Sequence, residues 1–241
     1  ISIRAPHAGG DQACVEALHQ SGISALRRFL NARLNLYSNV YFHRTTRALD
    51  LHLQEIFSDT LQMMYPESPV KNLDAYLHCD EWSLFSEVQG WLSVKDARKR
   101  RLALEWQKIH ARELKWKMSF AAEISIDQIQ RGTEFVGAEN YESKIRERLP
   151  AKLKKLAFKV DVATQDPRPL NPIAEPGRQI NIFNPVTGRT SAEPLHDIYR
   201  FIPARVRHFR VFALNHDHDE DLAMAAEAAL GNIEKSLPTN V

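Results

Sequence analysis

Two arginines and two tyrosines share a helical spacing near residue 40: Arg33, Tyr37, Tyr41 and Arg44 stand at i, i+4, i+8 and i+11. At about 3.6 residues per turn, this spacing puts all four on one stripe of a helix. An arginine binds phosphate through a charge-assisted fork, and a tyrosine, like the neighbouring Phe42, can stack on a base or a sugar. The stripe is therefore a candidate wall of a nucleotide pocket. The alternative is a buried stripe, in which Arg33 pairs with a carboxylate and the tyrosines pack in the core; chemistry alone favours this alternative.

Three other features could carry chemistry. The run HDHDED, from His216 to Asp221, offers imidazole and carboxylate ligands for a first-row metal. It lies between an expected strand and an Ala-rich helix, where acidic side chains meet the positive helix end, so we favour a helix cap and a solvated turn. His196-Asp197 is an isolated pair without further ligands nearby and is discounted as a metal site. Cys79 is expected on the apolar face of a helix, in the core, rather than as a nucleophile.

Composition limits the class of protein. The chain has 241 residues, 44% of them apolar and 26% charged, so it can bury a core of one domain or two lobes. The formal net charge of +2 does not by itself indicate a polyanionic partner. Cys14 and Cys79 show neither metal-binding nor disulfide spacing, which favours a reducing cytoplasm. No apolar run approaches the roughly 20 residues that span a bilayer, and no signal peptide is visible, so we expect no membrane partner.

Helical patterns dominate the first part of the chain. Apolar residues recur at intervals of three and four from Ser24 to Met64, which predicts one long helix or two in series, stopped by Pro66. Further helical patterns cover residues 72–92, with a helix start at Asp80, and residues 95–120, 125–131 and 139–155.

Beyond residue 156 apolar and polar residues alternate. This alternation predicts strands at LAFKVDVAT (156–164), QINIFN (179–184) and HFRVFAL (208–214), with a proline-rich loop at 166–178 and helices at 191–201 and 219–236. The predicted fold class is mainly α with an α+β C-terminal lobe. We expect a helical region over 1–155 and, over 156–241, a small antiparallel sheet with helices.

One block resembles a known family. SGISALRRFLNARLNLYSNVYFHRTTRALDLHLQEIF, residues 21–57, resembles the helix after the metal-binding core of HD-domain phosphohydrolases of the deoxynucleoside triphosphate triphosphohydrolase (dGTPase-like) family. That helix carries Arg, seven residues, then Tyr-x-His-Lys/Arg, matched here by Arg33, Tyr41, His43 and Arg44. YLHCDEW, IHARELKWKM, VDVATQDPRPLNP and IYRFIPARVRHFRVFA are also similar to segments of that family.

The resemblance implies roles for these residues. Arg33 would contact substrate phosphates, Tyr41 would lie against the sugar or base, and Tyr37 would be a pocket neighbour. His43 and Arg44 would face the pocket or a nucleotide site at an oligomer interface. The activity implied is hydrolysis of dNTPs to nucleoside and triphosphate, and the helical part would be half of an HD-type fold.

The metal motifs of that family are not matched. They are a His, a His-Asp pair and a later Asp, all N-terminal to this helix, whereas the sequence begins ISIRAPH without Met. We therefore expect a missing N-terminal region that supplies the divalent metal, and we assign neither a metal ligand nor a catalytic residue to this chain. Without that metal the chain alone is expected to be inactive.

A second reading is a non-catalytic module for nucleic-acid binding or oligomerisation. Basic residues are dense over 98–117 and 144–155, and such patches can bind phosphate backbones or a partner chain. The commoner explanation of like-charged runs is a solvated helix face. The expected partners are therefore a nucleotide, a second copy or an N-terminal half, and nucleic acid in the second reading.

Overall fold

The computed structural model describes residues 2–6, 14–126, 137–165, 181–191 and 205–231. Its strands are β1 (Ser2–Pro6), β2 (Cys14–His19), β3 (Lys117–Ile126), β4 (Phe158–Gln165), β5 (Asn181–Asn184), β6 (Arg189–Ser191) and β7 (Arg205–Ala213). Its α helices are α1 (Ile23–Leu36), α2 (Arg44–Met64), α3 (Leu73–Leu77), α4 (Glu81–Gly90), α5 (Ala97–His110), α6 (Ala138–Arg148) and α8 (Asp219–Leu230). Short 3-10 turns lie at Gln20–Gly22, Trp91–Ser93 and Ala151–Leu153, and a π turn, η2, spans Tyr37–Tyr41.

The first long helical pattern forms two helices in series, α1 and α2, which confirms one of the two predicted arrangements. The second helix ends at Met64, just before Tyr65 and Pro66. The predicted helix start at Asp80 is also confirmed: its carboxylate accepts a 2.7 Å hydrogen bond from the Ser83 backbone N–H, and the Ser83 hydroxyl accepts one from the Asp80 N–H.

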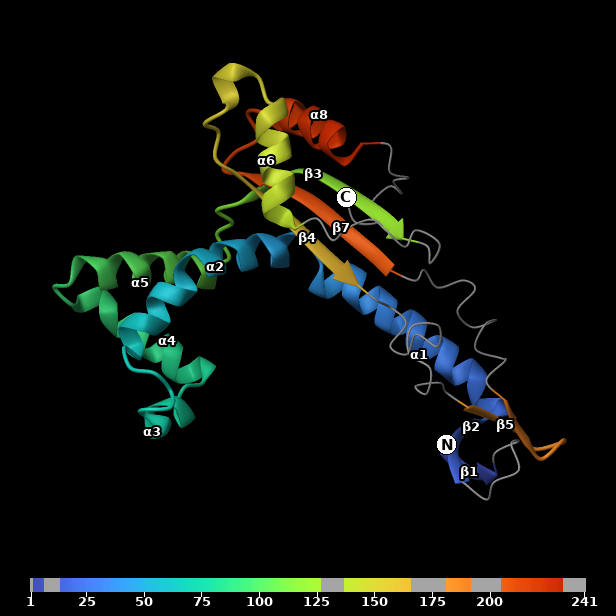
Figure 1. The fold of residues 1–241 in the computed structure, drawn as a ribbon. Coiled ribbons are helices and arrows are strands. Elements are labelled where there is room, and N and C mark those ends of the chain that lie inside the picture. The colour runs from blue at the N-terminus through green and yellow to red at the C-terminus, as the bar shows by residue number, and fades with distance from the viewer. Residues whose placement is uncertain (1, 7–13, 127–136, 166–180, 192–204, 232–241) are drawn as a thin grey trace.

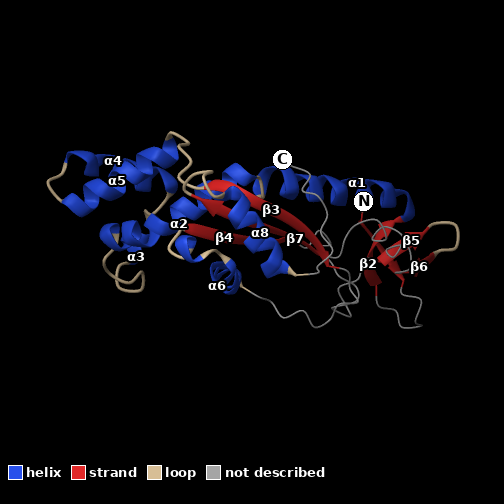
Figure 2. Ribbon diagram, turned by 90° about the horizontal axis from the view of Figure 1, so that it is seen from above, coloured by secondary structure: helices blue, strands red, loops and turns tan. Residues whose placement is uncertain are grey.

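One end of the molecule is purely helical (Figures 1 and 2). There α2, α4 and α5 pack around two buried indoles, Trp91 and Trp106. The Trp106 indole N–H donates to the buried Thr60 hydroxyl at 2.9 Å, so its polar atom is satisfied inside the core.

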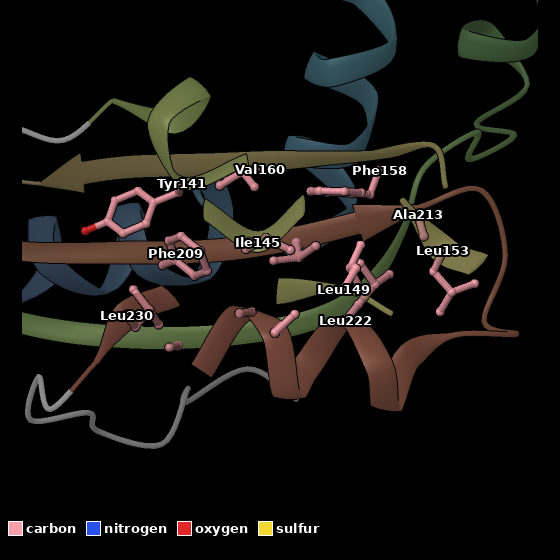
Figure 3. Close-up of a cluster of buried hydrophobic side chains, with 14 of the residues drawn as sticks. Tyr141, Ile145, Leu149, Leu153, Phe158, Val160, Phe209, Ala213, Leu222 and Leu230 are labelled. Atoms are coloured by element: carbon pink, nitrogen blue, oxygen red, sulfur yellow. The ribbon is translucent and has the colours of Figure 1, made fainter. Parts of the chain in front are cut away.

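The centre of the molecule is a three-stranded antiparallel sheet in the order β3-β7-β4, with α6 and α8 on one face. Figure 3 shows the apolar core between them, where Phe209, Ile145 and Leu222 are fully buried. This confirms a mainly α fold with an α+β lobe and antiparallel pairing.

The opposite face of this sheet looks toward α2. Phe212 of β7 is fully buried there, against Ala48 and Leu51 of α2 and the Trp116 ring. Side chains alternate along a strand, so His208 and Arg210 lie on the same face as Phe212. The β7 side chains that face α6 and α8 are therefore apolar at Phe209, whereas those on the α2 side include the polar His208 and Arg210.

A second sheet, in the order β1-β2-β5-β6, lies at the far end of α1 (Figures 1 and 2). Its β2 and β5 are parallel, and the other two pairs are antiparallel. The expectation of a helical N-terminal region is wrong for residues 2–6 and 14–19, which are strands. The strand predicted at 179–184 exists as β5, but it belongs to this second sheet.

The helix predicted over 95–120 is α5 followed by β3, and residues 125 and 126, predicted helical, also belong to β3. Ala and Glu favour a helix, but Phe120, Ala122 and Ile124 alternate toward the core, and pairing with β7 decides the outcome. The pattern at 139–155 divides at Pro150 into α6 and a 3-10 turn. Residues 127–131 lie outside the described part of the chain.

In the C-terminal lobe, β4 and β7 confirm two predicted strands, and α8 confirms the last helix as far as Leu230. Ser191, the first residue of the helix predicted over 191–201, is instead the last residue of β6. The rest of that helix, the proline-rich loop from residue 166 and residues 232–236 lie outside the described residues. The division at residue 155 stays a prediction; strands from both sides of it pair in both sheets.

Within the described ranges, no helix has the length and apolar character to cross a membrane.

Candidate functional site

The predicted stripe lies where α1 passes into α2. The turn η2 is wider than an α helix, and the Phe42 N–H donates to the Tyr37 carbonyl at 2.8 Å, five residues back. The chain then leaves the helix at Phe42 and re-enters one at Arg44. His43 caps α2, with its Nδ1 accepting a hydrogen bond from the Thr45 N–H at 3.3 Å.

The wide turn η2 and the break in the helix after it divide the predicted stripe. Arg33, Tyr37 and Tyr41 stay together: the Arg33 guanidinium carbon lies 5.0 Å from the Tyr37 ring centroid, and the two tyrosine rings meet edge to face at 5.1 Å. Arg44 does not join them. The prediction that all four residues share one stripe is wrong because it assumed an unbroken α helix.

The Arg33 environment differs from a buried ion pair. Its Nε is buried and has no hydrogen-bond acceptor, and no carboxylate pairs with it among the described residues. Tyr37 is half-buried, and Tyr41 is 51% exposed. The group therefore presents an arginine stacked on one tyrosine, with a second tyrosine open to solvent.

Arg44 belongs to a different cavity. This cavity, of about 330 Å³, is lined by Arg44, Thr45, Ala48, Leu114, Trp116, Lys117, Met118, Phe212 and His216. Two cationic side chains, Arg44 and Lys117, thus lie beside the rings of Trp116 and Phe212. His43 is not in this lining; its described role is the helix cap.

Next to the tyrosine group lies a set of buried polar residues that the sequence did not predict as a site. Asp161 of β4 accepts two hydrogen bonds from Arg47 of α2, at 3.0 and 2.5 Å. Arg210 of β7 lies opposite Asp161 in the strand register, with its Nη1 3.8 Å from Oδ2 of Asp161. Its Nη2 donates to the Phe42 carbonyl, and the rings of His208 and Phe42 meet edge to face at 5.3 Å.

Burial and a hydrogen bond shift the pKa values of three residues of this cluster. Burial and, to a smaller degree, the nearby charge of Arg210 lower the pKa of His208 to about 4, so this imidazole is neutral at pH 7. Burial also lowers the pKa of Arg210, while the hydrogen bond to Asp161 raises that of Arg47. Charged residues at inward strand positions, Asp161 and Arg210, were the available signal in the sequence.

The other candidates can also be placed. Asp219 and Asp221 lie in the first turn of α8, and His216 Nδ1 lies 2.8 Å from Asp219 Oδ2, but the N-cap, His218, makes no side-chain cap bond. Among the described residues, no group of three or more His, Cys, Asp and Glu side chains gathers as a metal site. His196-Asp197 lies outside them.

Cys79 is placed differently from its prediction. It is half-buried in the loop between α3 and α4, on neither a helix nor a core face. It lines a cavity of about 780 Å³ together with Tyr65 and Tyr76.

Several residues of the basic stretches make structural contacts. Arg146 donates to the Lys154 and Leu156 carbonyls and lies over the Phe158 ring at 4.4 Å. In the other stretch, ion pairs join Arg98 to Asp59, Lys108 to Glu105 and Lys115 to Glu55. Arg100 and Arg101 are exposed.

Comparison with known proteins gives a likeness of fold. No family model and no curated protein matches the sequence. Among solved structures, the chain is similar to the crystal structure of a hypothetical protein from Aquifex aeolicus, with a TM-score of 0.53 and 18% sequence identity. The match covers 90% of this chain and 47% of that one, so this chain spans about half the length of its structural neighbour.

Proposed function

We propose that this chain is the nucleotide-binding part of an HD-type phosphohydrolase that converts dNTPs to nucleoside and triphosphate. The observation that supports the proposal is the grouping of Arg33, Tyr37 and Tyr41 on one side of η2. Among the described residues no group of three or more His, Cys, Asp and Glu side chains gathers as a metal site, and the proposal leaves the divalent metal, and the water that it would activate, to residues other than these.

In this proposal Arg33 binds the triphosphate. A guanidinium presents a planar fork of donors to phosphate oxygens, and a carboxylate partner would compete for those donors. Arg33 has no such partner among the described residues, and the Tyr37 ring holds its guanidinium by a cation–π contact. The arginine is therefore oriented, and although its Nε is buried, its two Nη groups have no carboxylate partner among the described residues and can bind an anion.

Tyr41 supplies the apolar contact for the nucleoside. Its ring is 51% exposed and is held edge to face by Tyr37, so a sugar or base can pack on its open side. Arg44 is assigned to a second nucleotide contact, in the cavity that it shares with Lys117 and Trp116. Such a contact is the one expected at an interface between copies, with His43 holding the start of α2 beside it. The proposal also keeps the expected cytoplasmic location.

Binding of a dNTP by this chain tests the proposal without requiring catalysis. Calorimetric titration should detect binding to the unmodified chain and at least a tenfold weaker affinity in Arg33→Ala. Arg27→Ala is the matched control, because Arg27 is an exposed arginine of the same helix, and it should bind as the unmodified chain does. Tyr41→Phe should keep the affinity and Tyr41→Leu should reduce it. Equal affinity of the Arg33→Ala and Arg27→Ala variants would remove Arg33 from the site.

A nucleic-acid module is the second proposal, supported by the exposed pair Arg100 and Arg101 on α5. Binding to DNA or RNA that weakens steeply with salt, and that is lost in the Arg100→Glu, Arg101→Glu double variant, would favour it. Absence of binding at low salt would exclude it.

A further inference from the structure

A side chain of the central sheet makes a hydrogen bond to the turn between η2 and α2. The last carbonyls of a helical segment have no partner within that segment, and the Phe42 carbonyl obtains one from the Arg210 guanidinium. Arg210 comes from the middle of β7, 168 residues further along the chain, and its side chain is only 9% exposed. A buried strand thus reaches the proposed nucleotide site through one hydrogen bond.

One carboxylate connects both sides of this turn. Asp161 takes two hydrogen bonds from Arg47, in the first turn of α2, and faces Arg210 across the β4–β7 pair. Arg47 also pairs with Asp50 at 2.9 Å. Asp161 therefore fixes the start of α2 through Arg47 and supports the arginine that holds the carbonyl of Phe42.

The Phe42 side chain continues this connection to the proposed site. Its ring lies between the His208 ring, at 5.3 Å, and the Tyr37 ring, at 5.7 Å. The centroid of the Tyr37 ring in turn lies 5.0 Å from the Arg33 guanidinium carbon. Contacts therefore run without interruption from the sheet to Arg33.

We infer that Arg210, supported by Asp161, is a positioning residue that sets the orientation of Tyr37 and Arg33 by fixing the turn at Phe42. The C-terminal lobe then acts as a support for the ligand-binding turn. For the ligand this inference rests on the proposed function, whereas the fixing of the turn is a property of the protein alone. Burying charges is unfavourable unless they are paired in a fixed geometry, which is what Asp161 provides to its two arginines.

Hydrogen exchange of the unliganded protein tests the fixing of the turn. In Arg210→Met the hydrogen-bonded backbone amides of residues 42, 43 and 45 should exchange at least tenfold faster, while those of α6 and α8 keep their rates. Arg210→Lys retains a charged donor and should restore part of the protection. Lys159→Gln, which removes a charge from β4 two residues before Asp161, is the matched control and should change neither region. If Arg210→Met does not fold, the exchange rates of Arg210→Lys and Asp161→Asn are compared with those of the unmodified chain instead.

A double-mutant cycle distinguishes positioning from general stability. If Arg210 acts through Arg33, dNTP affinity falls at least fivefold in Arg210→Met, and Arg33→Ala with Arg210→Met binds no more weakly than Arg33→Ala alone. Additive losses would overturn the inference, because they mean that Arg210 acts independently of Arg33.

The two proposals fail in different ways. If Arg33→Ala loses binding while Arg210→Met changes neither exchange nor affinity, the positioning role is wrong and the proposed function stands. If the unmodified chain binds no dNTP, the proposed function is wrong, and the exchange rates alone decide whether Arg210 fixes the turn: unchanged rates overturn that role and faster rates support it.

Discussion

The two faces of the β3-β7-β4 sheet are buried by different means. On one face Phe209, Val211 and Ala213 of β7 enter an apolar core closed by α6 and α8 (Figure 3). On the other, the alternate residues His208 and Arg210 are also less than 10% exposed, but their neighbours are charged or aromatic. The same strand therefore serves an apolar core with one set of side chains. With the other set it forms a polar cluster at His208 and Arg210, next to the smaller apolar contact of Phe212.

This difference separates stability from geometry. Apolar burial stabilises a fold in proportion to area and with little dependence on direction. Buried charges contribute little net stability but require particular distances and angles. The apolar face accordingly holds the lobe together, and the polar face sets where the η2 turn lies.

The largest expected effect is on the apolar face. Phe209 is fully buried, with its ring 5.0 Å from that of Tyr141, so Phe209→Ala removes a large side chain and leaves a cavity. The expected loss in the free energy of unfolding is about 3–5 kcal/mol, measured by urea denaturation. Phe29→Ala, at a 60% exposed ring, is the control and should cost less than about 1 kcal/mol. Similar losses in the two variants would contradict the apolar core.

The polar face should respond differently to single and multiple substitution. Asp161→Ala leaves Arg47 and Arg210 without their shared carboxylate and should cost about 3 kcal/mol. Replacing Arg47 and Arg210 by Met and Asp161 by Leu together should recover most of that stability, because no buried charge is left unpaired. Asp50, the other partner of Arg47, is 39% exposed and stays solvated. The triple variant should nevertheless show rapid amide exchange at residues 42, 43 and 45. If it were both stable and fully protected there, the cluster would not determine the geometry of the turn.

Acid should weaken the polar face through His208. Its pKa is about 4 in the folded protein and about 6.5 in the unfolded chain, so between these values only the unfolded chain binds the proton. Stability contributed by neutral His208 is complete above about pH 6.5 and falls by about 2–3 kcal/mol as the pH decreases to 4. Unfolding curves of His208→Gln should lack this loss, whereas His216→Gln, at an exposed side chain, should retain it. Parallel curves for the native chain and His208→Gln would show that His208 is not buried as a neutral ring.

The sequence predicted the elements whose signals are local. Periodicity located α1 and α2, alternation located β4 and β7, and Asp80 marked a helix start. It did not predict β3, because Ala and Glu in that segment favour a helix until pairing with β7 is known. Nor did it predict the second sheet, since the parallel pairing of β2 with β5 joins segments more than 160 residues apart.

The candidate site was predicted in part for a similar reason. The grouping of Arg33 with Tyr37 and Tyr41 follows from spacing within one helix. The separation of Arg44 depends on the π turn, which adds a residue that the periodicity does not show. The partnership of Asp161 with Arg47 and Arg210 depends on three distant segments, so residue types alone could not reveal it.

The smallest expected effect concerns Phe42, where the polar face meets the proposed site. Phe42→Leu keeps an apolar side chain but loses two edge-to-face ring contacts, each worth about 0.5–1.5 kcal/mol in other proteins. We expect about 1 kcal/mol of destabilisation, and a coupling of about 0.5 kcal/mol with His208→Leu in a double-mutant cycle measured by urea unfolding. The Arg210 guanidinium donates to the backbone carbonyl of Phe42, not to its side chain, so this bond survives the change and amide protection at residues 42, 43 and 45 should persist. A Phe42→Leu variant that loses protection as Arg210→Met does would show that ring packing, rather than the guanidinium, holds the turn.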